Sequence, residues 1–169
     1  MIRLLTGSTH TGKTLLAQRL LERHGAPYLS IDHLKMGLIR SGMCPLTPES
    51  TDEALTAVLW PVVREIVKTA VENGQSLTVE GCYIPFNWRE DFDASCLPHI
   101  RFLCLVFSEA CTRFDTIQTH ANAIERRKDD SFCTMELLLA ENRRNLEACR
   151  RRGLPYYLID GPYAPPLDW

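Results

Sequence analysis

Five short apolar runs, separated by longer segments of helical periodicity, organise the chain. They predict strands at residues 2–6, 27–31, 76–80, 100–107 and 156–159. Several of the runs are continuously apolar rather than alternating, which is typical of strands that are covered on both faces.

The segments between these runs predict helices. Residues 14–23 carry leucines on neighbouring turns and are followed by Gly25, a common helix stop. Residues 53–72 form a longer pattern, which a capping box from Ser50 to Glu53 is expected to open and Pro61 to kink or interrupt. Residues 135–152 form a third, and shorter helices are expected at 34–39 and 109–123.

This alternation predicts a single α/β domain over residues 1–169, with a mainly parallel sheet and helices on both faces. Ligands of such sheets bind at the carboxyl ends of the strands. Candidate chemistry is therefore expected in the residues that follow each strand.

The first strand is followed by a complete G-x-x-x-x-G-K-[ST] motif. Its glycines allow the loop to curl so that successive backbone N–H groups face phosphate oxygens, and the following helix adds its positive dipole end. Lys13 is expected to reach the β- and γ-phosphates and the Thr14 hydroxyl to bind Mg²⁺. A glycine loop that merely turns the chain is the alternative. The motif comprises Gly7, Ser8, Thr9, His10, Thr11, Gly12, Lys13 and Thr14.

With this motif between a strand and a helix, the chain resembles the P-loop kinases, which include nucleoside monophosphate, shikimate and gluconate kinases and chloramphenicol phosphotransferase. The resemblance covers nearly the whole chain as a pattern of strands, but only the first motif is specific in its letters. It implies a three-layer P-loop NTPase fold with five parallel strands in the order 2-3-1-4-5, ATP as phosphate donor and a mobile lid.

Asp32 follows the second strand. A carboxylate there can accept a proton from a substrate hydroxyl or orient that hydroxyl for in-line attack. The resemblance implies this role, since chloramphenicol phosphotransferase and shikimate kinase have an Asp at the end of the second strand. The alternative is a helix N-cap, a position that favours Asp, and one residue could do both.

Glu80 and Gly81 end the third strand and are the best Walker B candidate. An acidic residue here would hold Mg²⁺, usually through its water shell. Most P-loop kinases have Asp, and the extra methylene of Glu favours a water-mediated role over direct ligation. A solvated glutamate at a strand end is the alternative. Residues 82–89 are rich in aromatic side chains and predict either an acceptor wall, with Arg89 a candidate for binding an acidic group, or a plug over the sheet.

The resemblance implies a lid at approximately 120–134, whose Arg126 and Arg127, helped by Lys128, would close on the transferring phosphoryl group. A solvated charged surface is the alternative. Arg143 or Arg144 on the next helix could also face the cleft. After the last strand, the resemblance places Gly161 beside adenine.

Composition narrows the function classes. Lys and Arg number 19 against 21 Asp and Glu, and this net charge of −2 does not favour a nucleic-acid partner. Seven cysteines without a C-x-x-C pair predict free thiols, and no apolar stretch reaches the roughly 20 residues that span a bilayer. We therefore expect a cytoplasmic protein without a membrane partner.

Together these features predict an ATP- and Mg²⁺-dependent kinase that phosphorylates a small molecule, with a hydroxyl as the expected acceptor. A nucleoside or nucleotide kinase is one alternative, although residues 80–83 only loosely match the D-G-[FY]-P-R pattern of nucleotide kinases. A nucleotide-dependent switch is another, although the chain has no N/T-K-x-D motif for guanine. A toxin-like kinase acting on a cell-wall sugar nucleotide is the third.

Overall fold

In the computed structural model, residues 1–109, 111 and 134–169 are described. Two short 3₁₀ helices, Trp88–Asp91 and Leu97–His99, lie between the third and fourth strands. The strands are β1 (Ile2–Gly7), β2 (Tyr28–Ser30), β3 (Leu77–Glu80), β4 (Ile100–Phe107) and β5 (Tyr156–Ile159). The longer helices are α1 (Lys13–His24), α2 (Ile31–Arg40), α3 (Asp52–Glu72) and α5 (Met135–Arg152).

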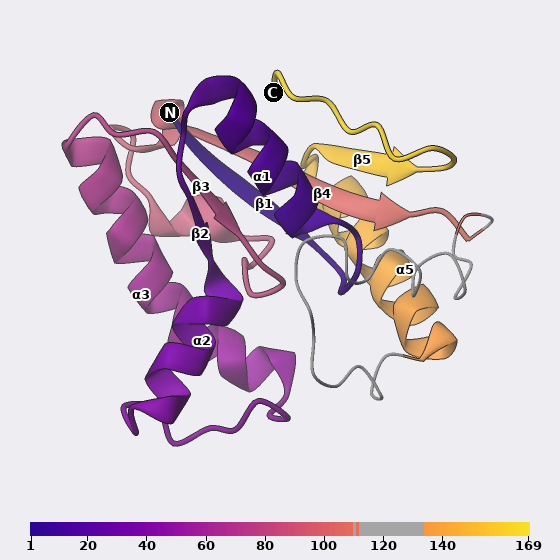
Figure 1. Cartoon of the computed structure of the whole chain (residues 1–169), viewed down its shortest axis with the longest axis horizontal. Coiled ribbons are helices and arrows are strands. Elements are labelled where there is room, and N and C mark those ends of the chain that lie inside the picture. The colour runs from indigo at the N-terminus through magenta and orange to yellow at the C-terminus, as the bar shows by residue number, and fades with distance from the viewer. Residues whose placement is uncertain (110, 112–133) are drawn as a thin grey trace.

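The five strands form one parallel sheet in the order β2-β3-β1-β4-β5, as predicted (Figure 1). In the register of the sheet Leu5 on β1 pairs with Glu80 on β3 and with Leu103 on β4. The carboxyl ends of the neighbouring strands β2, β3 and β1 therefore lie next to one another. Whatever follows these three strands is brought to the same edge of the sheet.

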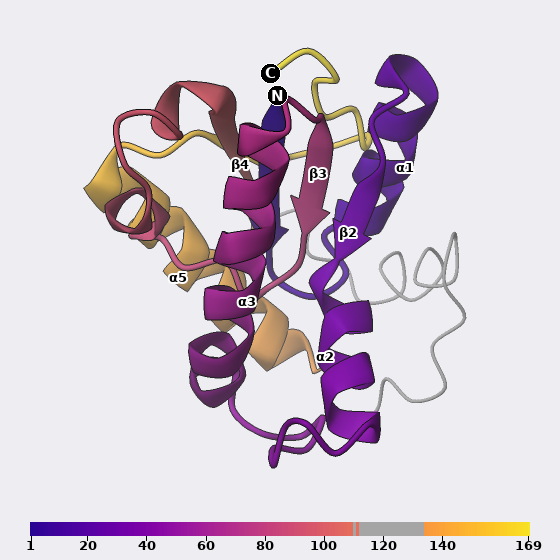
Figure 2. The ribbon, with the colours of Figure 1, turned by 90° about the vertical axis from the view of Figure 1, so that its left-hand side faces the viewer.

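Helices cover both faces of the sheet, and the strands supply apolar side chains to each face. One core cluster joins the sheet to α3 and α5, while a second joins it to α1 and the segment after β5. Successive residues of β1 alternate between these clusters, since Leu4 belongs to the first and Leu5 to the second. Figure 2 shows the sheet between α1 on one side and α3 and α5 on the other. The three layers predicted from the sequence are confirmed.

The start of α3 differs from the prediction by one residue. Its N-cap is Thr51, whose hydroxyl accepts a hydrogen bond from the Ala54 N–H at 3.3 Å. Ser50 is used in the preceding turn, where its hydroxyl accepts from the Thr47 N–H. The capping box from Ser50 to Glu53 is therefore wrong. Pro61 lies inside α3 without interrupting it.

Among the described residues, no helix has the length and the apolar character that crossing a membrane requires.

Candidate active site

The loop between β1 and α1 curls around one backbone carbonyl. The Ser8 carbonyl accepts hydrogen bonds from the Thr11 hydroxyl at 2.8 Å and from the Lys13 ammonium at 2.8 Å. The Thr11 N–H also donates to it, at 3.4 Å. Lys13 is 7% exposed, so its charge is held inside the loop. This arrangement closes the curl that the motif predicts.

Two positions of this loop require glycine. Gly7 has φ 147°, and a Cβ there would lie 2.5 Å from the Leu105 carbonyl oxygen. Gly12 has φ 79°, and a Cβ there would lie 2.8 Å from the Tyr163 ring. His10 has φ 63°, a left-handed conformation that is rare for residues other than glycine and that collects at functional sites. The loop therefore keeps a backbone conformation that is unfavourable for most residues, which indicates that its shape serves a function.

The loop and the end of β3 present groups that fit a phosphate and a magnesium ion. The Ser8 hydroxyl is buried and has no hydrogen-bond partner in the described part of the chain. The Thr14 hydroxyl lies 3.3 Å from a carboxylate oxygen of Glu80 and donates to it. Thr14 lies in the first turn of α1 and Glu80 ends β3, and these are the two residues that the sequence nominates for Mg²⁺. Hydroxyl and carboxylate oxygens are suitable ligands for that ion.

Glu80 is only 1% exposed, so the alternative of a solvated glutamate at the strand end is wrong. Over residues 1–109, 111 and 134–169, no group of three or more His, Cys, Asp and Glu side chains could hold a metal ion by itself. Mg²⁺ is commonly bound by one or two protein groups together with phosphates and water. Thr14 and Glu80 match that smaller protein contribution.

Asp32 lies in the first turn of α2 and is paired with a lysine. Ser30 is the N-cap of this helix, so the alternative of Asp32 as the N-cap is wrong. The Lys35 ammonium donates to Asp32 at 2.6 Å and to the Tyr83 hydroxyl at 2.9 Å. The three side chains join the start of α2 to the loop after β3.

Lys35 stays positively charged at this place. Burial alone would lower the pKa of Lys35, but the Asp32 carboxylate and the Tyr83 hydroxyl outweigh burial and raise it. Burial raises the pKa of Tyr83 to about 12, so this hydroxyl stays protonated. Sequence analysis missed Lys35, although its spacing of three residues from Asp32 on a helix is the signal of such a pair.

The aromatic segment after β3 packs mainly into the core. Trp88 is 2% exposed and stacks on Phe102 with ring centroids 5.9 Å apart. Arg89 is exposed, and its guanidinium lies over the Trp88 ring at 5.5 Å. Of the two predictions for residues 82–89, an acceptor wall or a plug over the sheet, the structure therefore supports the plug. Tyr83 contributes to both the core and the site, because its ring is buried while its hydroxyl meets Lys35.

The helix α5 brings a carboxylate to the loop between β1 and α1. Burial and the nearby Asp52 raise the pKa of Glu141, whereas Arg144, the Thr9 N–H and Lys13 act to lower it. Arg143 is instead paired with Glu109 at 2.6 Å, and both side chains are exposed. Of the two arginines proposed for the cleft, Arg144 is the one whose charge acts on this group. Glu141 was missed by sequence analysis, since nothing in its local sequence marks it.

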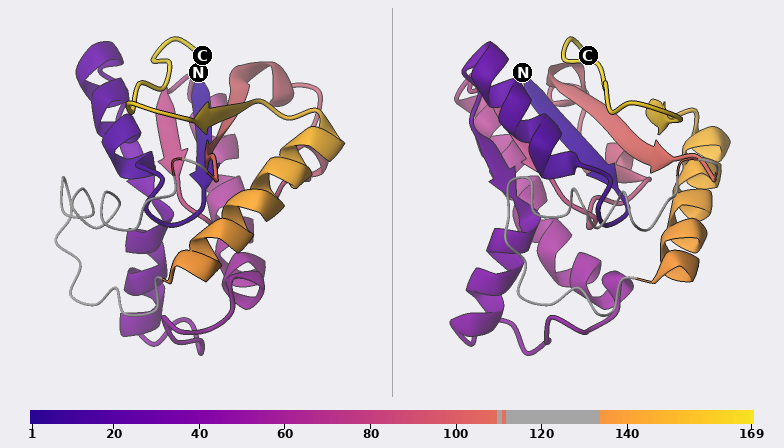
Figure 3. Two further views of the ribbon diagram at one scale, coloured as in Figure 1. Left: turned by 90° about the vertical axis from the view of Figure 1, so that its right-hand side faces the viewer. Right: turned by 45° about the vertical axis from the view of Figure 1, so that its right-hand side comes forward.

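The segment after β5 touches the loop through a residue other than the expected one. Gly161 is exposed, with open space where its side chain would be, whereas the Tyr163 hydroxyl donates to the Gly12 carbonyl at 2.6 Å. Figure 3 shows this segment and the loop on the side of the sheet where α1 lies. Arg126, Arg127, Lys128, nearly all of the expected lid at 120–134 and most of the expected helix at 109–123 lie outside the described residues.

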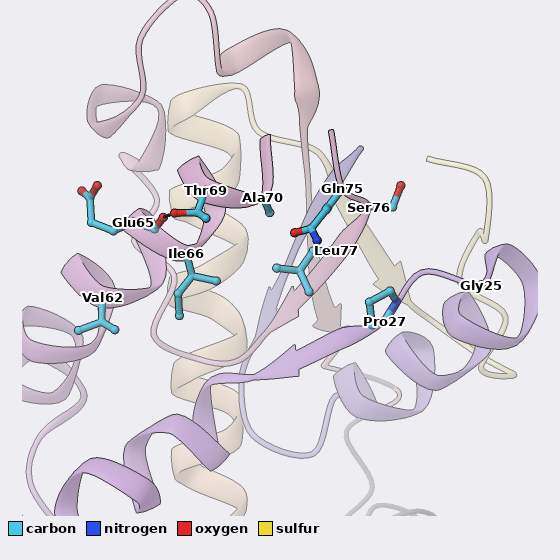
Figure 4. A pocket seen from close by; sticks show the side chains of 10 residues that line it. All are labelled: Gly25, Pro27, Val62, Glu65, Ile66, Thr69, Ala70, Gln75, Ser76 and Leu77. Atoms are coloured by element: carbon cyan, nitrogen blue, oxygen red, sulfur yellow. Dashed lines mark hydrogen bonds between the residues drawn. The ribbon is translucent and has the colours of Figure 1, made fainter. Parts of the chain in front are cut away.

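A groove of about 700 Å³ lies at the opposite end of the sheet (Figure 4). It is bounded by the starts of β2 and β3, with Pro27 and Leu77, and by Val62 and Ile66 of α3. None of the candidate residues at the carboxyl ends of the strands lines it. The groove is therefore separate from the candidate active site.

Comparisons with known proteins find similarity in structure. No protein-family profile matches the chain, and no curated protein matches it in sequence. The structure of a gluconokinase from Sinorhizobium meliloti matches with a TM-score of 0.53 and 19% identity, over 98% of this chain and 83% of that one. A candidate kinase from Chloroflexus aurantiacus matches with a TM-score of 0.62 and 18% identity, over 99% and 89%.

A shikimate kinase from Bacteroides thetaiotaomicron matches with a TM-score of 0.54 and 12% identity, over 94% of this chain and 85% of that one. At these identities the matches define the fold. The chain has the fold of the P-loop kinases, with the five-stranded parallel sheet in the order 2-3-1-4-5.

Proposed function

We propose that this protein is an ATP- and Mg²⁺-dependent kinase that transfers the γ-phosphoryl group of ATP to a hydroxyl of a small-molecule acceptor. The observation that carries the proposal is the meeting of Thr14 and Glu80 beside a complete phosphate-binding loop. Asp32 follows the next strand of the sheet, on the acceptor side. The fold that the chain shares with the similar kinase structures supports the proposed kinase activity.

On the donor side, the backbone N–H groups from Gly7 to Thr14 hold the phosphates. Lys13 leaves the Ser8 carbonyl and donates to the β- and γ-phosphates, which exchanges a neutral partner for an anionic one. Thr14 and Glu80 would hold Mg²⁺, which when bound neutralises charge on the phosphate oxygens. Gly161 would lie beside the adenine ring of the bound nucleotide and has no other proposed role.

On the acceptor side, Asp32 accepts a hydrogen bond from the acceptor hydroxyl and orients its oxygen toward the γ-phosphate. The Lys35 ammonium, 2.6 Å from the Asp32 carboxylate, holds that carboxylate in place as a hydrogen-bond acceptor. Phosphoryl transfer through a loose transition state needs little proton removal before the new bond forms. Orientation is therefore the main role of Asp32, and it takes the proton late.

Arg126 and Arg127 are proposed to close over the transferring group from the lid at approximately 120–134, where positive charge would stabilise the equatorial oxygens. We also propose that residues 1–169 act as one domain in the cytoplasm, without a membrane or nucleic-acid partner. The described cysteines are all free, which is the state that a reducing compartment maintains.

The test is a screen for ADP release with Mg-ATP and a panel of sugar acids, polyols, hydroxylated ring acids, nucleosides and nucleoside monophosphates. The wild type and Lys13→Ala are run side by side, and ³¹P NMR identifies the product. Phosphorylation of one non-nucleotide class by the wild type alone supports the proposal. Phosphorylation of nucleosides or nucleotides supports the alternative acceptor. Tight ATP binding with no stimulating acceptor contradicts a kinase and favours a switch.

A further inference from the structure

The segment after β5 returns to the proposed phosphate-binding loop and contacts it at Gly12. The Tyr163 hydroxyl donates to the Gly12 carbonyl at 2.6 Å, and the Tyr163 ring fills the space where a side chain at position 12 would be. These two residues are 151 positions apart in the sequence. The contact therefore joins the segment after β5 to the glycine-rich motif that follows β1.

This hydrogen bond acts on one particular peptide group. The Gly12 carbonyl and the Lys13 N–H belong to the same planar trans peptide and point in opposite directions. Fixing the carbonyl therefore fixes the N–H. That N–H is the first of α1, and the first N–H groups of a helix together form its positive end. The Gly12 carbonyl also accepts the first helical bond, from the Leu16 N–H at 2.9 Å.

The tyrosine is itself firmly placed. The Arg19 guanidinium of α1 lies over its ring, 5.4 Å from the centroid. Burial raises the pKa of Tyr163, so its hydroxyl stays protonated and remains a donor. Further along the segment, His24 donates to the Leu167 carbonyl at 2.9 Å and Arg23 pairs with Asp168 at 3.3 Å. The segment is thus attached to α1 at several points.

We propose that Tyr163 is a positioning residue of the phosphate-binding loop, whose hydroxyl sets the Lys13 N–H toward the phosphates before a nucleotide arrives. The inference rests on the proposed function, because it needs a loop that binds nucleotide phosphates. A preset donor lowers the cost of ordering on binding, and a chain of hydrogen bonds through one peptide strengthens its members. Tyr163 therefore raises affinity through the phosphates and not through the base.

The experiment is calorimetric titration of the wild type and Tyr163→Phe with two ligands in magnesium buffer, ADP and inorganic tripolyphosphate. Tyr163→Phe keeps the ring and loses the hydroxyl. We expect it to weaken both ligands by the same factor, roughly threefold to tenfold, the range of one hydrogen bond. Tyr157→Phe is the matched control, since it removes a hydroxyl from the same apolar cluster and is expected to bind like the wild type.

Unchanged affinity of Tyr163→Phe for both ligands would overturn the proposal. Weaker ADP binding with unchanged tripolyphosphate binding would overturn it too, because the hydroxyl would then act on the base. If Tyr163→Phe does not fold, Arg19→Gln takes its place, because it removes the exposed guanidinium that lies over the Tyr163 ring. Arg19→Gln must then lower the affinity for both ligands by the same factor. An unequal effect on the two affinities, or no effect, contradicts the proposal. A folded wild type that binds neither ligand contradicts the proposed function instead.

Discussion

The donor and acceptor sides of the candidate site are built in different ways. Apart from Glu80, the proposed donor side is one contiguous stretch, from Gly7 to Thr14, and most of its proposed binding groups belong to the backbone. The acceptor side consists of side chains from separate elements, with Asp32 and Lys35 on α2 and Tyr83 after β3. A backbone site depends on loop shape and recognises a common group, phosphate. A site made of side chains can change its ligand with single substitutions.

This difference predicts that the two sides can be damaged separately. Substitutions on the donor side should weaken nucleotide binding, whichever acceptor is present. Substitutions around Asp32 should slow transfer or weaken acceptor binding while leaving nucleotide binding intact. The following variants test that separation, from the largest expected effect to the smallest.

Asp32→Asn should reduce kcat by about 10²- to 10⁴-fold. The asparagine amide cannot take the proton of the acceptor hydroxyl, and it lacks the negative charge with which the Asp32 carboxylate attracts that hydroxyl. Its affinity for ATP should stay within about twofold, because the donor side is untouched. Steady-state kinetics and calorimetry measure the two quantities. Glu53→Gln, an exposed change in the first turn of α3, is the control. Normal turnover in Asp32→Asn would refute its assigned role.

Lys13→Ala should lower transfer by at least about 100-fold and weaken nucleotide binding, because it removes the one buried cation that can reach the phosphates from the loop. Lys68→Ala, which removes a half-buried lysine paired with Glu65 on α3, should do neither. Coupled ADP release and titration with Mg-ATP separate the effects. If Lys13→Ala keeps wild-type affinity for ATP, the donor side is wrongly assigned.

Lys35→Met should raise the KM for the acceptor and lower kcat by about tenfold, because the Asp32 carboxylate loses the group that holds its orientation. Lys35→Arg, which keeps the charge, should restore part of the activity. ATP affinity should not change in either variant. A Lys35→Met enzyme with unaltered kinetics would show that the pair has no part in acceptor binding.

Glu141→Gln should have the smallest effect, a gain of less than about 1 kcal/mol in the free energy of unfolding. Burial raises the pKa of Glu141 in the folded protein above its unfolded value. The folded state therefore binds this proton more tightly, and stability falls as the pH rises through the folded pKa. The gain should be present above that pKa and vanish at acidic pH. Urea unfolding at several pH values measures it, and a loss of stability at neutral pH contradicts it.

The strands and the glycine-rich loop after β1 were predictable from the sequence because each depends on local pattern, whereas the order of the strands was predicted only through the resemblance to the P-loop kinases. The cap of α3 was misplaced by one residue, because Ser50 and Thr51 are both good caps and only the turn through Thr47 decides between them. Lys35 was missed although its spacing of three residues from Asp32 is local, but its contact with Tyr83 spans 48 residues and the contact of Tyr163 with Gly12 spans 151. Such contacts depend on the packing of the whole fold.

The measurement that most directly tests the account is calorimetric titration of folded protein with Mg-ATP, comparing the wild type, Lys13→Ala and Asp32→Asn. The account predicts saturable binding to the wild type, the same affinity in Asp32→Asn, and a strong loss in Lys13→Ala. If the folded wild type binds neither ATP nor GTP, or if binding survives in Lys13→Ala and is lost in Asp32→Asn, the assignment of the donor and acceptor sides is contradicted.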